Sequence, residues 1–407
     1  MPAHAMFWKV VEPDAWPSPP TRLSYSTLRG IEACPRRWAL DRGDYTESLG
    51  VRGYPRRPRM GTLAGETAHH ALQIVAEALH DAGCTSPEDP GVVGVLRALG
   101  GLSAVLNSCA DDVIARFAAN PRAAHRIPQI RVDLVRRLPE LRRTVQGTLQ
   151  RMFGVTAPPA SAAGQMEPSA EESKRSALGP GFHAEVELAP AGLGWVGVAD
   201  AIKIARHTCE IVDYKTGEED PDHSEQVRIY AFLWALDGEI NPERRLATDL
   251  TVVYPGTTRF VPAPSGPELD ELEIELHRRA DSARAALGYQ PPRAEVSAAN
   301  CRFCDVKHLC GEYWTREGQE SVREGQAPSL QSLQVEILEP LSIRAWRVAV
   351  DLNPHLQGGT VALLLAQEAM SWQGGEQLRL VDAYLKESVE DHLHVIHLGS
   401  SSEAYLV

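Results

Sequence analysis

Apolar residues recur at helical spacing in the first part of the chain. Val75 and Leu79 would lie on one face of an amphipathic helix, and Gly83 would end that helix. A turn followed by another helix is predicted near the N-terminus, with Ser24 or Ser26 as its N-terminal cap. The segments predicted to be helical in this part are residues 21–40, 65–83 and 91–153.

The pattern changes to short apolar runs in the middle of the chain. Residues 157–181 are rich in Pro, Ala, Ser and Glu and predict a mobile loop. Beyond this loop, runs of β-branched and apolar residues bounded by turn residues predict strands, with two helices among them. The predicted strands are residues 182–189, 194–205 and 208–216 and a hairpin over 249–264; the predicted helices are residues 221–238 and 268–287.

The last part of the chain has a third pattern. Residues 315–329 are polar and predict a linker. From about residue 330, short alternating strands are separated by Gly, Asn, Ser and Asp, and about five strands in this length fit a small barrel. We therefore expect two domains, residues 1–325 and 326–407, with a helical insertion at about 84–180 in the first.

The composition is that of a folded protein. The chain has 407 residues, of which 43% are hydrophobic, and this length is enough for two domains. No apolar stretch is long enough to cross a membrane, and the N-terminus lacks the pattern of a signal peptide. We therefore expect a cytoplasmic protein with no membrane partner. In that compartment the seven cysteines are expected to be metal ligands or buried thiols rather than disulfides.

The charge is negative overall but locally positive. A formal net charge of −13 counts against a protein that simply coats nucleic acid. Carboxylates that bind metal add negative charge, however, and contacts with phosphate can be local. Arg56, Arg57 and Arg59 form one basic cluster and are candidate contacts with nucleic acid. A solvated surface is the alternative interpretation of such a cluster.

Three charged residues in the predicted strands suggest a metal site. Asp213 and Lys215 are two apart at the end of an apolar strand, so they would project from the same face. Asp200 lies in the preceding strand, which could bring the two aspartates together. Mg²⁺ and Mn²⁺ prefer carboxylate oxygen, and either ion would polarise a phosphate and activate a bound water. Lys215 would orient that water or stabilise the charge that develops on the phosphate.

In this context the three residues resemble the active site of the PD-(D/E)XK nuclease superfamily. More narrowly, the chain resembles the RecB/AddB-type branch, which includes the CRISPR-adaptation exonuclease. The resemblance covers roughly residues 20–315, apart from the helical insertion and the loop. It implies an α/β fold with a restriction-endonuclease-like core, the aspartates as metal ligands and Lys215 as a catalytic residue.

Further motifs of that family carry the resemblance on either side of the aspartates. A G-x-x-x-H motif is matched by Gly65 and His69, which implies that His69 completes the metal site. His70 is adjacent and leaves the register open, although the spacing from the glycine favours His69. The G-x-x-D strand is matched by Gly197 and Asp200.

A Q-x-x-x-Y motif follows the aspartates and lysine. Gln226 and Tyr230 match it and are four apart, so they would share one face of a helix. The resemblance implies a catalytic role for both, although Tyr230 could instead be a core aromatic. Glu185 matches an acidic residue that such families often carry on the first strand, and we expect it to act in catalysis too.

Four cysteines flank the predicted nuclease core. Cys34 precedes it, and Cys301, Cys304 and Cys310 follow in a C-x2-C-x5-C arrangement. The spacing alone is compatible with zinc or with an iron-sulfur cluster. The family resemblance implies a [4Fe-4S] cluster with a structural role, because it would tie distant segments together. The remaining cysteines are expected to be buried thiols: Cys84, Cys109 and Cys209.

The predicted barrel resembles the OB-fold of single-strand-binding proteins. Glu376, Arg379, Ala383 and Leu385 match its strand pattern. OB-folds stack bases on aromatic side chains and follow the phosphates with basic ones. A barrel that packs or docks a protein partner is the alternative. The candidates for contact with nucleic acid are Trp372, Arg379 and Tyr384, with Trp346 and Lys386.

These patterns lead to one functional expectation. We expect a metal-dependent exonuclease that acts on single-stranded DNA or on ends opened by a separate helicase, in DNA repair, recombination or phage defence. The alternatives are a subunit that binds DNA or a helicase without cutting, and an RNA nuclease. No G-x-x-x-x-G-K-[ST] motif is present, so the chain encodes no P-loop motor of its own.

Overall fold

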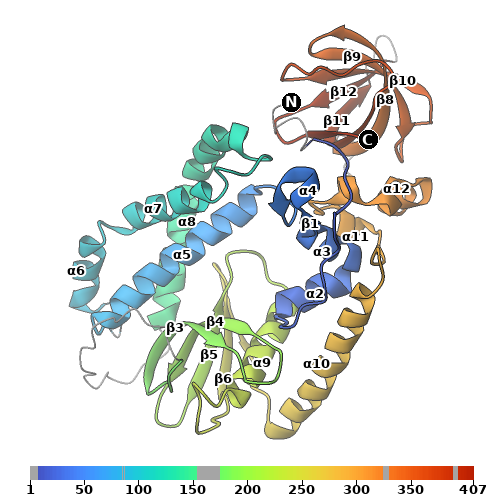
Figure 1. Cartoon of the computed structure of the whole chain (residues 1–407). Helices are drawn as coiled ribbons and strands as arrows, with labels where there is room; N and C mark the ends of the chain where they lie inside the picture. Colours follow the sequence, from blue (N-terminus) through green and yellow to red (C-terminus); the bar gives the residue numbers. More distant parts are fainter. Residues whose placement is uncertain (1–7, 85, 87, 154–174, 324–329, 388–392) are drawn as a thin grey trace. The chain divides into compact units, whose positions relative to one another are not determined.

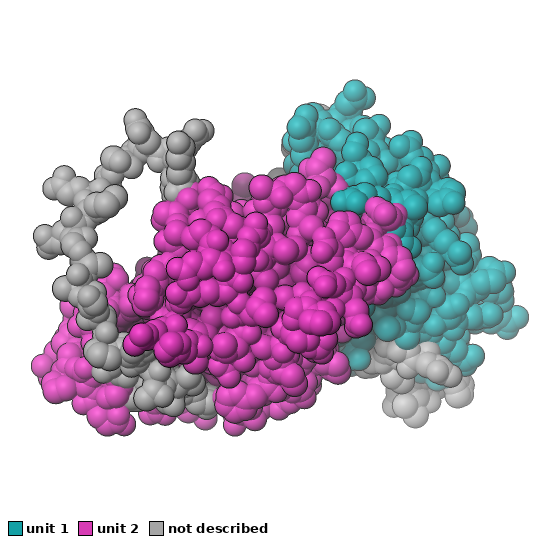
Figure 2. Space-filling view, turned by 90° about the horizontal axis from the view of Figure 1, so that it is seen from below, with its two compact units in different colours: residues 1–19, 29–57, 282–407 teal, residues 20–28, 58–281 magenta. Residues whose placement is uncertain are grey.

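The computed structural model describes residues 8–407 except residues 85, 87, 154–174, 324–329 and 388–392. Its internal contacts divide the chain into two compact units, shown in Figure 2. Unit 1 consists of residues 1–19, 29–57 and 282–407, and unit 2 of residues 20–28 and 58–281. The predicted domain boundary near residue 325 therefore lies inside unit 1. Most of the predicted mobile loop, residues 157–181, lies outside the described residues.

A five-stranded sheet forms the centre of unit 2, in the order β3-β4-β5-β6-β7. Only β5 and β6 pair in parallel, and the other neighbours are antiparallel. All six residues of β5 are buried, as expected for a central strand. The strands are β3 (Gly181–Leu188), β4 (Gly197–Ile204), β5 (Cys209–Tyr214), β6 (Asp249–Val253) and β7 (Thr258–Val261), so each predicted strand and the hairpin are confirmed.

Helices cover this sheet. The helix α9 (Pro221–Leu236) makes the crossover between the parallel strands β5 and β6. The long α5 (Met60–Asp81) lies near the sheet (Figure 1), and it shares a hydrophobic core with two helices of the insertion, α7 and α8, and with buried residues of β4, β5 and β6. The insertion consists of α6 (Pro90–Ala98), α7 (Leu102–Ala115), a short 3-10 turn (Ala124–Arg126) and α8 (Ile127–Phe153).

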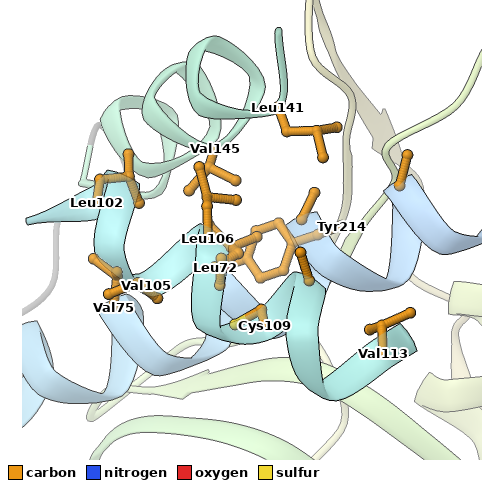
Figure 3. Packing of buried hydrophobic residues seen from close by; sticks show 14 of the residues in the cluster. Leu72, Val75, Leu102, Val105, Leu106, Cys109, Val113, Leu141, Val145 and Tyr214 are labelled. Carbon is orange, nitrogen blue, oxygen red and sulfur yellow. The ribbon is translucent and has the colours of Figure 1, made fainter. Parts of the chain in front are cut away.

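The predicted apolar stripe of α5 is the source of this packing. Leu72 and Val75 lie against Val105 and Leu106 of α7, and Tyr214 of β5 joins them (Figure 3). Their side chains are almost fully buried. The helix ends as predicted at Gly83, whose φ of 70° is in the left-handed region that glycine favours. The sequence pattern thus placed α5 correctly.

The N-terminal helical segment is interrupted, which the pattern did not show. It forms α2 (Tyr25–Ala33) and α3 (Pro35–Arg42), and Cys34 lies between them. Ser24 accepts a hydrogen bond from the backbone N of Thr27 at 3.1 Å and caps α2, as predicted. The Cys34 sulfur caps α3 by accepting from the Arg37 N–H at 3.4 Å. Pro35 lacks an N–H and suits only the first turn of a helix, so the chain starts a new helix there.

Unit 1 contains a closed five-stranded barrel. Its strands are β8 (Leu330–Ser342), β9 (Ala345–Leu352), β10 (Thr360–Ala366), β11 (Gln377–Glu387) and β12 (His394–Leu398). They pair in the order β12-β10-β9-β8-β11, and β11 pairs again with β12 to close the barrel. Only β10 and β12 are parallel. This architecture is consistent with an OB-like domain. A sixth strand, β13 (Glu403–Leu406), pairs with β11.

The rest of unit 1 is built from short elements around the cysteines. They are β1 (Asp44–Tyr45), α4 (Thr46–Leu49), β2 (Val51–Arg52), α11 (Ala298–Cys301), the 3-10 turns Lys307–Leu309 and Gly311–Trp314, and α12 (Arg316–Val322). The helix α10 (Gly266–Leu287) leads into them from unit 2.

The polar segment before the barrel contains a helix, where we predicted only a linker. Thr315 caps α12 by accepting a hydrogen bond from the Gly318 N–H at 3.0 Å, and Gln319 and Val322 are buried. The polar composition hid these two anchoring side chains. The last residues of the predicted linker, 324–329, lie outside the described residues.

Within unit 1 the cysteine segment and the barrel share a hydrophobic core. Tyr405 of β13 has no exposed surface and stacks on His308, with ring centroids 3.8 Å apart. The same core contains Val381 of β11 together with three of the cysteines.

Among the described residues no single helix is both long and apolar enough to cross a membrane; α6 and α7 meet that test only as a pair, by length and composition, and are bent by 42°.

We predict that Tyr405→Ala destabilises the protein by about 3–5 kcal/mol, because removing a buried aromatic ring leaves a cavity between the barrel and the cysteine segment. Thermal and urea unfolding would measure this loss. The matched control is Tyr384→Ala, on the same barrel, because that ring is 39% exposed. Equal stability of the Tyr405 variant and the wild type would contradict the shared core.

Candidate active site

Three side chains from different elements form a cluster of metal-binding groups in unit 2. His69 comes from α5, Glu185 from β3 and Asp200 from β4. The His69 Nε2 lies 2.9 Å from a Glu185 carboxylate oxygen and 3.7 Å from an Asp200 carboxylate oxygen. One ligand atom from each residue lies within 4.8 Å of the other two. The structure thus brings together three of the residues that the sequence selected.

Sheet register brings the acidic residues together. The pairs on either side of Glu185 in the β3–β4 ladder place it opposite Asp200. The β4–β5 ladder places Asp200 next to Asp213 when its register is continued by one residue. Glu185 has a φ of 48°, a left-handed conformation that is unusual for a non-glycine residue within a strand. Such strain is frequent at functional sites.

Burial gives these carboxylates unusual electrostatics. Loss of solvation and the nearby charge of Asp213 raise the pKa of Asp200 to about 7. Burial also raises the pKa of Asp213, in spite of Lys215. The hydrogen bond to Glu185 raises the pKa of His69. Buried carboxylates resist ionisation because their mutual repulsion is not screened by water, and a cation between them would favour the ionised forms.

Lys215 is held beside Asp213 by a chain of hydrogen bonds. Its Nζ lies 2.7 Å from an Asp213 carboxylate oxygen and donates to the Gln226 side-chain oxygen at 2.9 Å. Gln226 in turn donates to the Tyr230 hydroxyl at 2.6 Å. Gln226 and Tyr230 share one face of α9, as the sequence predicted. This chain fixes the position of the lysine relative to the aspartates.

Gly197 makes room for the tyrosine of this chain. A Cβ atom at Gly197 would lie 2.8 Å from a ring carbon of Tyr230, which is closer than real Cβ contacts. Tyr230 is buried among core residues and also makes the hydrogen bond to Gln226. The two interpretations of Tyr230, as a core aromatic and as part of the site, are therefore compatible.

A pocket of about 310 Å³ lies beside the metal-binding cluster. Gly65 lets α5 approach the end of β5, because a Cβ there would lie 3.0 Å from the Thr216 hydroxyl oxygen. His70 also lines this pocket, but it contacts Arg116 rather than the acidic cluster, so the structure places His69 at the cluster. The lining residues are Gly65, Glu66, His69, His70, Tyr214, Lys215, Thr216, Gly217 and His223.

The donor set of this site fits a hard divalent cation. Carboxylate oxygens of Glu185 and Asp200 lie beside an imidazole nitrogen, and a further buried carboxylate, Asp213, is near. Mg²⁺ and Mn²⁺ prefer such oxygen ligands and accept imidazole in addition. Asp213 is drawn towards Lys215 rather than into the group of three.

The sequence analysis did not select His223, which the structure places at the pocket. His223 lies in the first turn of α9 and is half-buried. Its Nδ1 is 2.9 Å from the Tyr254 hydroxyl. Burial and the charge of Lys215 lower the pKa of His223. The signal in the sequence was its spacing, since residues 223, 226 and 230 fall on one helical face.

The four predicted cluster cysteines line one pocket in unit 1, although Cys34 is far from the others in sequence. The Cys34 sulfur lies within hydrogen-bond distance of the backbone N–H groups of Arg37 and Glu295, at 3.4 and 3.5 Å. Burial raises the pKa of Cys304 and of Cys310 to about 12. Arg37 and Lys307 add positive charge to the lining of this pocket.

Arg57 has a structural role where we predicted contact with nucleic acid. Its side chain is only 8% exposed and lies 2.5 Å from an Asp382 carboxylate oxygen and 3.2 Å from one of Glu403. Lys307 also contacts Asp382, at 3.0 Å. The run of arginines in the sequence did not show that these carboxylates would neutralise one of its members.

Arg379 is also directed into the protein. It donates to the backbone oxygen of His308 at 2.7 Å, and its guanidinium lies 5.2 Å from the centre of the Trp314 ring. Burial lowers its pKa to about 10. The structure therefore assigns Arg379 to the packing of β11 on the cysteine segment, and the prediction of a nucleic-acid contact is corrected.

The other predicted contacts with nucleic acid differ in exposure. The Arg56 side chain is 65% exposed and lies 3.1 Å from Asp41, whereas Arg59 is half-buried before α5. Trp372 is half-buried and packs against Trp346, which is fully buried in the barrel core. Tyr384 is 39% exposed on β11.

Comparison with known proteins gives one strong match. The model of the PD-(D/E)XK nuclease superfamily matches residues 22–311 of the chain. No curated protein matches. Because the match spans most of the chain and its range includes the acidic cluster, Lys215 and the four cysteines, it supplies the family to which the site belongs.

Similar solved structures resemble the chain only remotely. The crystal structure of SSO0001 is 21% identical over 33% of this chain, with a TM-score of 0.21, and this chain spans 62% of its length. A murine DNA-binding protein bound to double-stranded DNA is 10% identical over 56% of this chain and 95% of its own, with a TM-score of 0.16. The family match over residues 22–311 gives the assignment: the chain belongs to the PD-(D/E)XK nuclease superfamily.

Proposed function

We propose that this protein is a metal-dependent DNA exonuclease of the RecB/AddB type, acting on single-stranded DNA or on ends opened by a separate helicase. One observation carries the proposal. His69, Glu185 and Asp200 form a metal-binding cluster beside the Asp213–Lys215 pair, at the edge of an open pocket. A module that only binds DNA would not require this arrangement of buried carboxylates and lysine.

In this proposal His69, Asp200 and Asp213 hold Mg²⁺ or Mn²⁺. A bound cation would polarise the scissile phosphate and lower the pKa of a water molecule. Glu185 lies on the same imidazole nitrogen, Nε2, that faces Asp200, so a cation held by His69 there would replace this hydrogen bond, and Glu185 could then bind a water or the cation. The register of β3 on β4 places that carboxylate opposite Asp200.

Lys215 would act on the phosphate itself. Its ammonium group can orient the attacking water or stabilise negative charge that develops on the phosphate oxygens. Gln226 holds this ammonium group, and Tyr230 holds Gln226, so both would act by positioning the lysine. Positioning of this kind contributes to the rate because the reacting groups need little reorganisation.

We further propose a [4Fe-4S] cluster bound by Cys34, Cys301, Cys304 and Cys310, with a structural role. The four cysteines line one pocket with Lys307. Tetrahedral zinc, with bonds of about 2.3 Å, would need sulfurs about 3.8 Å apart. Within the described parts of the chain, no three of these sulfurs all lie within 4.8 Å of one another, which is wider than a tetrahedral zinc site needs. This width favours a larger metal group.

The barrel would contribute to substrate binding. Its closed order of strands supports the OB-like interpretation, with residues 326–407 as the barrel domain and residues 1–325 as the nuclease domain with the cysteines. Tyr384 is exposed and could stack on a base, and Lys386 beside it could contact a phosphate. Both lie on β11.

We predict that Asp200→Ala, Asp213→Ala and Lys215→Ala each lower the rate of DNA cleavage by at least about 100-fold, with smaller effects on DNA binding, because these groups act on the transition state. Cleavage of end-labelled single-stranded DNA, duplex DNA and RNA would measure the rate and choose the substrate. The matched control is Arg206→Ala, which removes an exposed cation from the turn between β4 and β5. Undiminished cleavage by the Lys215 variant would refute the site, and a preference for RNA would refute the substrate.

We predict that the metal-free protein becomes less stable as the pH rises from 5 to 8. The pKa of Asp200 is about 7 in the folded protein, against about 3.9 when unfolded. Between these two values the folded state binds more protons than the unfolded state, so stability falls as the pH rises and levels off above the pKa of the folded state. Melting temperatures in EDTA would show the decline. Mg²⁺ should restore stability at pH 8, and Asp200→Asn should flatten the pH profile. An Asp200→Asn profile parallel to that of the wild type would contradict the pKa assignment.

We predict that the protein purified without oxygen contains about four iron and about four sulfide atoms per chain. Cys34→Ala should lose both and lower the melting temperature, whereas Cys84→Ala should keep the metal because Cys84 does not line the cysteine pocket. Metal analysis and the visible absorption spectrum would measure this. Stoichiometric zinc without iron would refute the cluster.

A further inference from the structure

The pocket beside the metal-binding cluster has polar groups that the proposed chemistry does not use. Glu66 and His70 line it, and both contact Arg116 from the end of α7, at 3.5 and 3.2 Å. Lys215 lines it too and contacts Asp213 and Gln226. His223 is the remaining imidazole in the lining. These contacts leave donor capacity to spare on His223, as they do on Lys215.

Two anchors fix the position of His223. It stands in the first turn of α9, on the same face as Gln226 and Tyr230, which hold Lys215. Its Nδ1 lies 2.9 Å from the hydroxyl of Tyr254, a residue that is only 2% exposed and directly follows β6. Within the described residues, no hydrogen bond engages the other ring nitrogen, Nε2.

We propose that His223 is a substrate-contacting residue that donates a hydrogen bond from Nε2 to a phosphate oxygen of the nucleic-acid strand in this pocket. When the Tyr254 hydroxyl donates to Nδ1, the neutral ring carries its proton on Nε2. Phosphate oxygens are strong acceptors, and the charged Lys215 in the same lining favours an anion there. The proposal deepens the proposed nuclease function and rests on it.

The expected role is positioning of the strand rather than the chemical step. A hydrogen bond to a phosphate oxygen that is made equally before and during the reaction contributes to binding and leaves the turnover number unchanged. Loss of one hydrogen bond to a charged group corresponds to roughly a tenfold weaker interaction. Tyr254 would be a residue that acts through His223.

Replacements of His223 can separate the two ring nitrogens. The side-chain nitrogen of Gln reaches the place of Nε2, whereas that of Asn reaches the place of Nδ1, beside Tyr254. We expect His223→Gln to bind DNA and cleave it nearly as the wild type does. We expect His223→Asn and His223→Ala to raise the KM roughly tenfold with kcat within about threefold. Tyr254→Phe should raise the KM by a smaller factor, because it removes only the group that orients the ring.

The measurement has two arms. Steady-state cleavage of end-labelled single-stranded DNA in Mg²⁺ gives KM and kcat. Fluorescence anisotropy of a labelled single-stranded oligonucleotide in EDTA gives the Kd without any cleavage. His277→Gln on α10 is the matched control, because this exposed imidazole contacts the Glu273 backbone oxygen of its own helix. It should leave KM, kcat and Kd unchanged.

Each pattern of results decides the matter. If His223→Gln keeps the KM and Kd of the wild type while His223→Asn and His223→Ala raise both, the contact through Nε2 is supported. If His223→Asn keeps the wild-type KM and Kd while His223→Gln raises them, His223 only supports Tyr254. The proposal would also be overturned if all replacements raised KM and Kd equally, or if none changed them. If the wild type cleaves no nucleic acid, the proposed function fails, and the anisotropy arm still decides whether His223 contacts the strand.

Discussion

Acidic side chains withdrawn from water and placed close together repel one another, and this repulsion is the constraint on which the site of unit 2 depends. Glu185, Asp200 and Asp213 come from three neighbouring strands, and the register of the sheet sets them side by side. The protein offsets the repulsion with His69 on one side and Lys215 on the other. The raised pKa of Asp200 shows that this compensation is partial. A bound divalent cation would complete it, so the cost of burying the carboxylates would also be a source of affinity for metal.

The elements around this row serve to hold its members in place. Gly65 brings α5 close to the end of β5, which carries His69 to the acidic residues. Gly197 lets Tyr230 approach the sheet, and through Gln226 the tyrosine holds Lys215. Both glycines act by the absence of a side chain. The glycines of the G-x-x-x-H and G-x-x-D motifs are therefore explained by the close contacts that a Cβ atom would make at these two positions.

Unit 1 is organised by buried ion pairs and a shared core. Arg57 and Lys307 both contact Asp382 of β11, and Arg379 of the same strand reaches the backbone of the cysteine segment. Removing one partner of such a network would leave an uncompensated buried charge. Of the arginines that looked like contacts with nucleic acid, Arg379 thus attaches the barrel to the cysteine segment, and Arg57 attaches the N-terminal part of unit 1 to the barrel.

The sequence by itself determined the elements and identified the candidate residues of the site. The helical spacing of α5, the apolar run of β5 and the alternation in the barrel are local patterns, and each produced the element expected. The residues Asp200, Asp213 and Lys215 were identifiable because their motif follows a strand. Only the tertiary structure decided which charges face inward, because a sequence does not show that Arg57 meets Asp382 across more than three hundred residues. The same applies to His223, whose place at the pocket depends on the crossover of α9 between two strands and on Tyr254 at the end of one of them.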